Sequence, residues 1–186
     1  MITRLYRSLF SALALVALVG SGTLCPVSAM ASVFRWDIIT ADSQGNPIPG
    51  GQATALADNV SGSIASITLT GSGTFDTSDD DSANITGGGT YVVRGFPEGS
   101  IQSSGTYKVT RLLHFEPTPV ISGTTILGGL VVLAIKYSDG SKGVLVVNCA
   151  INAPPQVTEG VNATKGTVDY WSIQGGFTVF HTGTAF

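Results

Sequence analysis

Short apolar, β-branched runs recur along most of this chain, and each is bounded by Gly, Pro, Asn or Asp residues. This pattern is typical of β-strands joined by tight turns, and no window shows a long apolar stripe with a helical period. Residues 52–58 are compatible with one short helical turn. The pattern predicts an all-β chain: one domain, built as an antiparallel β-barrel or β-sandwich of about eight strands. The predicted strands lie near residues 33–40, 64–75, 90–94, 105–116, 127–137, 143–151, 167–173 and 177–181.

The clearest local signal is the segment 137–142, Tyr-Ser-Asp-Gly-Ser-Lys, which separates two strongly apolar runs. An Asp-Gly pair supplies the positive φ angles that a tight β-hairpin turn requires. The runs on either side, 130–135 and 144–147, are apolar at consecutive positions. We therefore predict a hairpin whose two strands are central in the sheet and covered on both faces.

A Gly-Thr-aromatic triplet occurs at residues 73–75, 89–91 and 105–107, at intervals of 16 residues. Sixteen residues correspond to about one strand plus its connection. Glycine within a strand allows a ring from a neighbouring strand to lie over bare backbone. We interpret the repeat as a packing feature of a curved sheet rather than as a ligand site.

The first 31 residues have the layout of a secretory signal peptide. Arg4 and Arg7 precede an apolar run at residues 9–19, and small residues then lead to Ala31, after which cleavage is expected. The apolar run is about half the length that a membrane-spanning helix needs. An uncleaved anchor is the alternative. The sequence thus predicts an exported protein, periplasmic or secreted, with residues 32–186 as the β domain and no stable membrane anchor after cleavage.

The predicted mature chain is acidic, with seven Lys or Arg residues against twelve Asp or Glu residues. Nucleic acids and anionic membranes bind to basic patches, so this balance argues against both as partners. Cys149 is the one cysteine after residue 31, so the mature chain cannot form an intrachain disulfide. Its stability must come from packing and from strand pairing.

An acidic loop follows the strand predicted at residues 64–75. Asp76, Asp79, Asp80 and Asp81 are close enough in sequence to surround a hard cation such as Ca²⁺. Their spacing matches no defined calcium loop and lacks the central glycine and the distal glutamate. A solvated acidic loop is the alternative interpretation, and no other cofactor is predicted.

Strict alternation along residues 105–116 puts Tyr107, Arg111 and Phe115 on the same, inward face. A buried guanidinium must be paired, and in a barrel interior Arg111 and Tyr107 would orient a small ligand. The alternative is that Arg111 reaches solvent near the sheet edge or pairs with a structural carboxylate.

Other residues that could take part in binding or catalysis give weaker signals. His114 and His181 are the two histidines of the chain, and a metal or acid–base site would require them to converge. Trp36 and Trp171 stand beside acidic residues, where exposed rings would bind sugars and buried rings would pack in the core. No nucleophile motif such as Gly-x-Ser-x-Gly is present.

Four parts of the chain carry a resemblance to known proteins. They are the segment Phe-Arg-Trp-Asp-Ile at residues 34–38, the Gly-Thr-aromatic triplets, and the stretches 137–147 and 159–171. Taken together they resemble a group of small exported bacterial β-proteins with no assigned activity. The resemblance implies export and β architecture and supplies no function.

The absence of a catalytic motif favours a non-enzymatic binding or cell-surface module over an enzyme. Its partner would be a protein, a glycan or a small apolar ligand. The alternative function is a small β-barrel carrier or enzyme that holds an apolar ligand in an internal pocket beside Arg111 and Tyr107.

Overall fold

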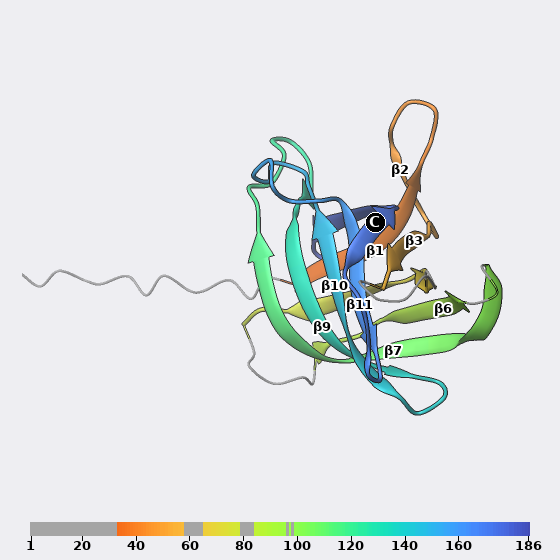
Figure 1. Cartoon of the computed structure of the whole chain (residues 1–186). Helices are drawn as coiled ribbons and strands as arrows, with labels where there is room; N and C mark the ends of the chain where they lie inside the picture. The colour runs from red at the N-terminus through yellow and green to blue at the C-terminus, as the bar shows by residue number, and fades with distance from the viewer. Residues whose placement is uncertain (1–32, 58–64, 79–83, 96, 98) are drawn as a thin grey trace, which may run out of the picture.

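The computed structural model describes residues 33–57, 65–78, 84–95, 97 and 99–186, and these residues form one antiparallel sheet of 14 strands (Figure 1). The strands are β1 (Val33–Ala41), β2 (Pro47–Pro49), β3 (Ala53–Leu56), β4 (Ser66–Leu69), β5 (Ser72–Asp76), β6 (Gly88–Gly95), β7 (Ser100–Pro117), β8 (Ile126–Leu127), β9 (Gly129–Tyr137), β10 (Lys142–Cys149), β11 (Gly160–Lys165), β12 (Val168–Tyr170), β13 (Ser172–Gly175) and β14 (Phe177–Thr182).

The all-β prediction is confirmed, and the predicted barrel is wrong because the sheet is open. Hydrogen bonds run along the path β12-β11-β10-β9-β7-β6-β5-β1-β14-β8 and do not return from its last strand to its first. A second arm leaves β6 through β4 and β3 to β13, and β2 pairs with β1. The sheet is therefore branched, with many more short strands than the eight that the sequence suggests.

The branch arises from a bend in the strand predicted at residues 64–75. β4 and β5 lie on the same edge of β6 in one continuous register, because Leu69 pairs with Tyr91 and Ser72 with Gly88. Between them Gly71 has a φ of +153°, which favours glycine. On the edge away from β6, β4 pairs with β3 before the bend, and β5 pairs with β1 after it.

The sheet folds back on itself around a single apolar cluster. β10 contacts β14, and β11 contacts β3 and β13. The end of the main path at β14 and the second arm at β3 and β13 therefore lie against the half of the sheet formed by β7 and β9–β12. Trp36, on β1, is fully buried in this cluster. Phenylalanine rings at 34, 75, 115 and 180 contact one another within it, as do tyrosine rings at 91, 107 and 137. Close aromatic packing of this kind supplies much of the burial that stabilises a small sheet protein.

The predicted hairpin is confirmed as β9 and β10. Tyr137 N–H donates to Ser141 O (2.9 Å), Gly140 has a φ of +89°, and the Asp139 carboxylate accepts from Ser141 N–H (3.0 Å). Lys165 donates to the same carboxylate, and its ammonium lies 5.1 Å from the centre of the Tyr137 ring. Both strands are central, as predicted. Their cover is incomplete, however, because the outward residues of β9 remain half-buried or exposed.

The strand β7 departs from the alternation expected from its sequence. Its pairing with β9 shifts register between Val109 and Arg111 and again between Leu112 and His114. Each shift inserts an extra residue, so the inward face continues from Tyr107 and Val109 through Leu112 rather than through Arg111. The prediction that Arg111 faces inward is therefore wrong: its side chain is exposed.

Three strands lack counterparts in the sequence prediction. β2 and β3 are three and four residues long, and β3 occupies the segment 52–58 for which we considered a helical turn. That expectation is wrong because residues 53–56 pair with β4 and β13 on both edges. β11 does alternate apolar and polar residues from Val161 to Thr164, and the sequence prediction missed this short two-residue period.

The packing interpretation of the Gly-Thr-aromatic triplets is confirmed at two positions. A Cβ on Gly73 would lie 2.8 Å from Nε1 of Trp36, and a Cβ on Gly105 would lie 3.2 Å from the ring of Tyr91. At Gly89 the close neighbour is backbone, since a Cβ would lie 1.9 Å from Thr70 O. All three glycines thus permit a close approach between strands.

Residues 1–31, the predicted signal peptide, lie outside the described residues, and so the cleavage site and export stay predictions. Within the part of the chain that the structure describes, no helix is long and apolar enough to cross a bilayer.

Candidate functional site

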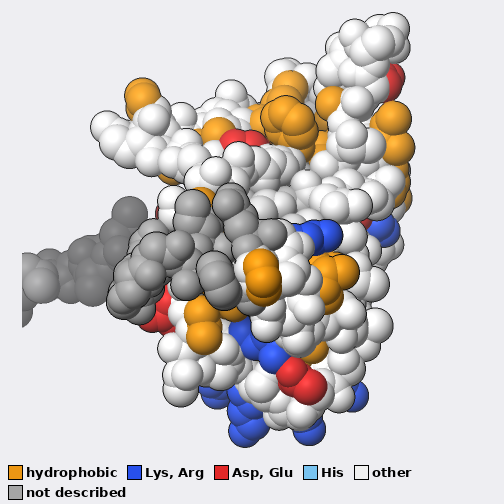
Figure 2. Space-filling model, turned by 45° about the vertical axis from the view of Figure 1, so that its right-hand side comes forward, with side chains coloured by type: hydrophobic (Ala, Val, Ile, Leu, Met, Phe, Trp, Pro, Cys, Tyr) orange, Lys and Arg blue, Asp and Glu red, His pale blue; other side chains and the backbone are white. Residues whose placement is uncertain are grey.

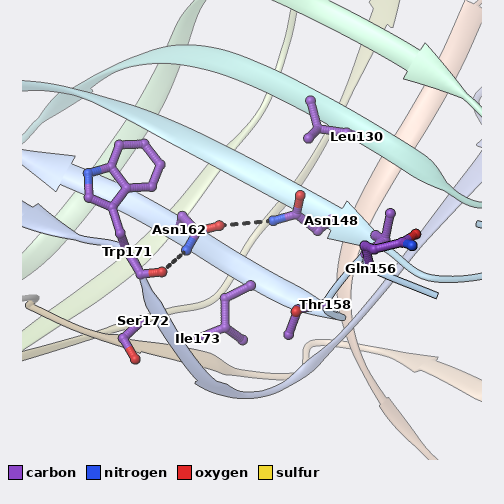
Figure 3. A pocket seen from close by; sticks show the side chains of 9 residues that line it. Leu130, Asn148, Gln156, Thr158, Asn162, Trp171, Ser172 and Ile173 are labelled. Carbon is purple, nitrogen blue, oxygen red and sulfur yellow. Dashed lines mark hydrogen bonds between the residues drawn. The ribbon is translucent and has the colours of Figure 1, made fainter. Parts of the chain in front are cut away.

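The candidate site is a pocket on the outward face of β10 and β11, beneath the loop that joins them (Figure 3). Its volume of about 550 Å³ lies within the range of small-ligand sites. We call it the Trp171 pocket, after the indole at its edge, which is 44% exposed. It is lined by Leu130, Asn148, Gln156, Val157, Thr158, Asn162, Trp171, Ser172 and Ile173.

Two asparagines form the polar floor of the Trp171 pocket. Asn148 Nδ2 donates to Asn162 Oδ1 (3.1 Å), and Asn162 Nδ2 donates to Trp171 O (2.7 Å). Figure 3 shows both bonds in line, with the Asn148 carbonyl oxygen turned away from Asn162. The chain of amides fixes both side chains and the backbone at Trp171, and no donor among the described residues is bonded to Oδ1 of Asn148. This oxygen is available to a hydroxyl group of a ligand.

Glu159 holds the loop that covers the pocket. Its carboxylate accepts from Ala150 N–H (2.7 Å) at one end of the loop and from Thr178 N–H (2.6 Å) on β14. The next residue, Gly160, has a φ of +128°, and a Cβ there would lie 2.8 Å from Cγ2 of Ile173. The carboxylate and the glycine together keep the pocket wall in place without a ligand, which lowers the entropic cost of binding.

The chemistry of the lining suits recognition of a polar ring. The residues that line the pocket in the described structure are apolar, amide or hydroxyl side chains, and none is titratable. An aromatic face beside amides and hydroxyls matches a molecule with one apolar face and a rim of hydroxyl groups.

Arg111 and Tyr107, the predicted ligand-binding pair, are not brought together. Tyr107 is 4% exposed, and its hydroxyl donates to Thr70 O (2.8 Å), at the bend between β4 and β5. Burial raises the pKa of Tyr107 far above its ordinary value. Its role in the structure is to hold that bend, whereas Arg111 lies on the opposite face of β7.

The predicted calcium site is described at one residue. Asp76 ends β5, and its carboxylate accepts from Ser78 N–H (2.8 Å) and from the Ser78 hydroxyl (2.7 Å), which lowers its pKa. Asp79, Asp80 and Asp81 lie outside the described residues. Among the residues that are described, no three His, Cys, Asp or Glu side chains gather around a possible metal position.

A buried charged cluster lies on the face of β1 opposite Trp36. Asp37, 1% exposed, accepts from Nε and Nη2 of Arg35, both at 2.7 Å. His181 is paired with Arg35 across β1 and β14 and is 4% exposed; its Nδ1 lies 3.3 Å from Thr125 Oγ1. His114 is exposed beside Glu116 on β7. The two histidines therefore occupy different environments and form no joint site.

Burial lowers the pKa of His181, and the nearby Arg35 acts in the same direction against the carboxylate of Asp37. The folded state thus binds a proton on this imidazole less readily than the unfolded chain, in which a histidine titrates near pH 6.5. The free energy of unfolding is expected to fall as the pH drops from 7.5 to 5.5, because the unfolded state then binds more protons. Urea unfolding at both pH values should show a smaller fall for His181→Gln. The control His114→Gln should match the wild type, and equal pH dependence in all three proteins would contradict the assignment.

Sequence reasoning missed the two asparagines of the pocket floor. Asn148 lies in an apolar strand, and Asn162 begins an Asn-x-Thr sequence that invites a glycosylation interpretation. The available signal was a single amide at an otherwise apolar strand position, which marks a buried polar group needing a partner. Of the two tryptophans, Trp171 is exposed and Trp36 is buried, so Trp171 alone meets the condition stated for sugar binding, which stays a prediction.

No family model, curated protein or solved structure matches this chain. The resemblance to small exported bacterial β-proteins therefore stays a prediction, and the functional argument rests on the geometry of the Trp171 pocket.

Proposed function

We propose that this chain is an exported, non-enzymatic binding module that holds a glycan in the Trp171 pocket. The observation that carries the proposal is the exposed indole of Trp171 beside the bonded amides of Asn148 and Asn162. A sugar ring presents C–H groups on one face and hydroxyls around its rim. The C–H face packs on an indole, and the rim bonds to amides and hydroxyls.

The arrangement of the two tryptophans supports this assignment. Trp36 is fully buried in the core, whereas Trp171 exposes 44% of its surface although a folded chain gains by burying such a ring. A large exposed aromatic at the rim of a preformed pocket is typical of a binding site.

Screening the purified protein on an array of immobilised neutral and acidic oligosaccharides tests the proposal. Trp171→Ala is expected to weaken binding of the retained glycans at least about tenfold, as for a central aromatic anchor. The matched control is Phe177→Ala, which removes an exposed ring (57% exposed) outside the pocket lining and should leave binding unchanged. Binding that survives Trp171→Ala, or glycan turnover by the purified protein, would contradict the proposal.

The alternative of a carrier with an internal pocket requires Arg111 and Tyr107 on one wall. Because Arg111 is exposed and Tyr107 is committed to the bend at Thr70, no observation favours it.

A further inference from the structure

Three lysines form a row across the outward face of neighbouring strands. Lys108 on β7 is directly opposite Lys136 on β9, and Lys136 is directly opposite Lys142 on β10. All three side chains are exposed, as is that of Arg111. We call these four residues the basic patch. In Figure 2, Lys and Arg side chains gather at the lower end of the molecule, where Figure 1 places the end of the β9–β10 hairpin.

The lysine row is unfavourable for the fold by itself. Like charges directly opposite each other on paired strands repel and destabilise the sheet. Among the described residues, none of the four cations of the patch forms an ion pair. Acidic side chains of this face stand at its margins, with Glu116 opposite Leu130 and Asp169 on the edge strand β12. A local feature that costs stability without compensation is expected at a functional site.

The basic patch also encloses a hollow. A depression of about 480 Å³ is lined by Arg111, Lys136 and Lys142 together with Thr110, Ala134, Ile135 and Gly143. An anionic group placed there would lie close to cations from three strands at once. The positive charges of all three would attract it together.

The basic patch and the Trp171 pocket occupy one continuous face. Along β9, Lys136, Ala134, Val132 and Leu130 alternate outward, and Leu130 lines the Trp171 pocket. Across the strands, Val132 pairs with Val146 and Val146 with Asn162. Three strand spacings and four residues separate Trp171 from Lys136, a span of ~20 Å. One monosaccharide cannot reach both places, whereas an oligosaccharide can.

We infer that the ligand of this face is an acidic polysaccharide, with one sugar ring on Trp171 and its carboxylate or sulfate groups along the basic patch. This inference rests on the glycan-binding function proposed above and adds the charge and the length of the ligand. The net charge alone does not describe this surface, because the chain is acidic overall and yet gathers four of its cations on one face.

Titration calorimetry with the purified protein tests the inference. The probes are polygalacturonate oligosaccharides of six to eight units, the same oligosaccharides after reduction of their carboxyl groups to alcohols, and heparin oligosaccharides of that length. At low salt an acidic probe is expected to bind at least about tenfold more tightly than the reduced, neutral probe, and the advantage should shrink as salt screens the charges. The triple variant Lys108→Gln/Lys136→Gln/Lys142→Gln should lose the advantage and keep its affinity for the neutral probe.

Two controls separate the possible outcomes. Arg94→Gln removes one cation from β6, outside the patch, and should leave acidic binding unchanged. If Trp171→Ala abolishes binding of neutral and acidic probes equally and charge gives no advantage, the pocket binds glycans and the inference about charge is wrong. If acidic probes bind and Trp171→Ala has no effect, the proposed function and the inference are both wrong. Binding of phosphatidylglycerol vesicles or duplex DNA that depends on the lysines, without polysaccharide binding, would also overturn the inference.

Discussion

Replacing Arg35 with alanine is expected to lower the free energy of unfolding by up to about 3–5 kcal/mol, the range for a buried ion pair that loses one partner, because Asp37 is buried although the Arg35 side chain is 25% exposed. The reason is the environment of Asp37, which is 1% exposed and receives two hydrogen bonds of 2.7 Å from the guanidinium. Without Arg35, the carboxylate of Asp37 would lose the cation that compensates its charge while most of its surroundings remain protein. Equilibrium unfolding in urea at pH 7.5 measures the effect.

A double variant, Arg35→Met/Asp37→Leu, separates the cost of an unpaired charge from the cost of lost packing. Apolar residues of similar size often replace a buried ion pair with little loss of stability. The double variant is therefore expected to recover most of the stability lost by Arg35→Ala. A double variant as unstable as the single one would show that this cluster contributes through its shape rather than through charge pairing.

Replacing Trp36 with alanine is expected to cost about 3–5 kcal/mol, as for other large aromatic residues removed from a core. The Trp36 side chain is fully buried, and Gly73 and Gly87 approach its ring so closely that their missing Cβ atoms leave room for it. Thermal or urea unfolding of the variant measures the loss.

Trp171→Ala is the matched comparison for Trp36→Ala, because it removes the same side chain from the surface. We expect it to change the free energy of unfolding by less than about 1 kcal/mol, as for most exposed positions, and to weaken the proposed glycan binding at least about tenfold. Equal losses of stability in the two variants would contradict the division into a structural and a binding tryptophan.

The strands that the sequence predicts well are those whose pattern is local. The β9–β10 hairpin follows from one Asp-Gly turn between two apolar runs, and its geometry is decided within about twenty residues. The Gly-Thr-aromatic triplets likewise mark positions where strands approach closely. Short strands such as β3 carry too few residues for a period to be recognised. They form because they pair with other strands on both edges.

The position of Arg111 shows where sequence reasoning stops. Alternation predicts a face only while register is kept, and the first of two register shifts in β7, between Val109 and Arg111, moves Arg111 outward and brings Leu112 inward. The position of such bulges depends on how β7 must curve between β6 and β9. That curvature is determined by residues outside β7. The candidate site has the same origin, since Asn148 on β10, Asn162 on β11 and Trp171 between β12 and β13 are brought together by the pairing of β10 with β11 and by side-chain hydrogen bonds.

The sequence by itself determines the all-β class, the principal hairpin, the close approaches at glycine and the lack of a recognisable catalytic motif, because turn chemistry and two-residue periodicity act over a few neighbouring residues. Only the tertiary structure decides that the sheet bends at Gly71 and stays open, that one tryptophan is buried and the other exposed, and that three lysines align on the same face as the Trp171 pocket. These features depend on register between distant strands, and a shift of one residue in register exchanges the two faces of a strand.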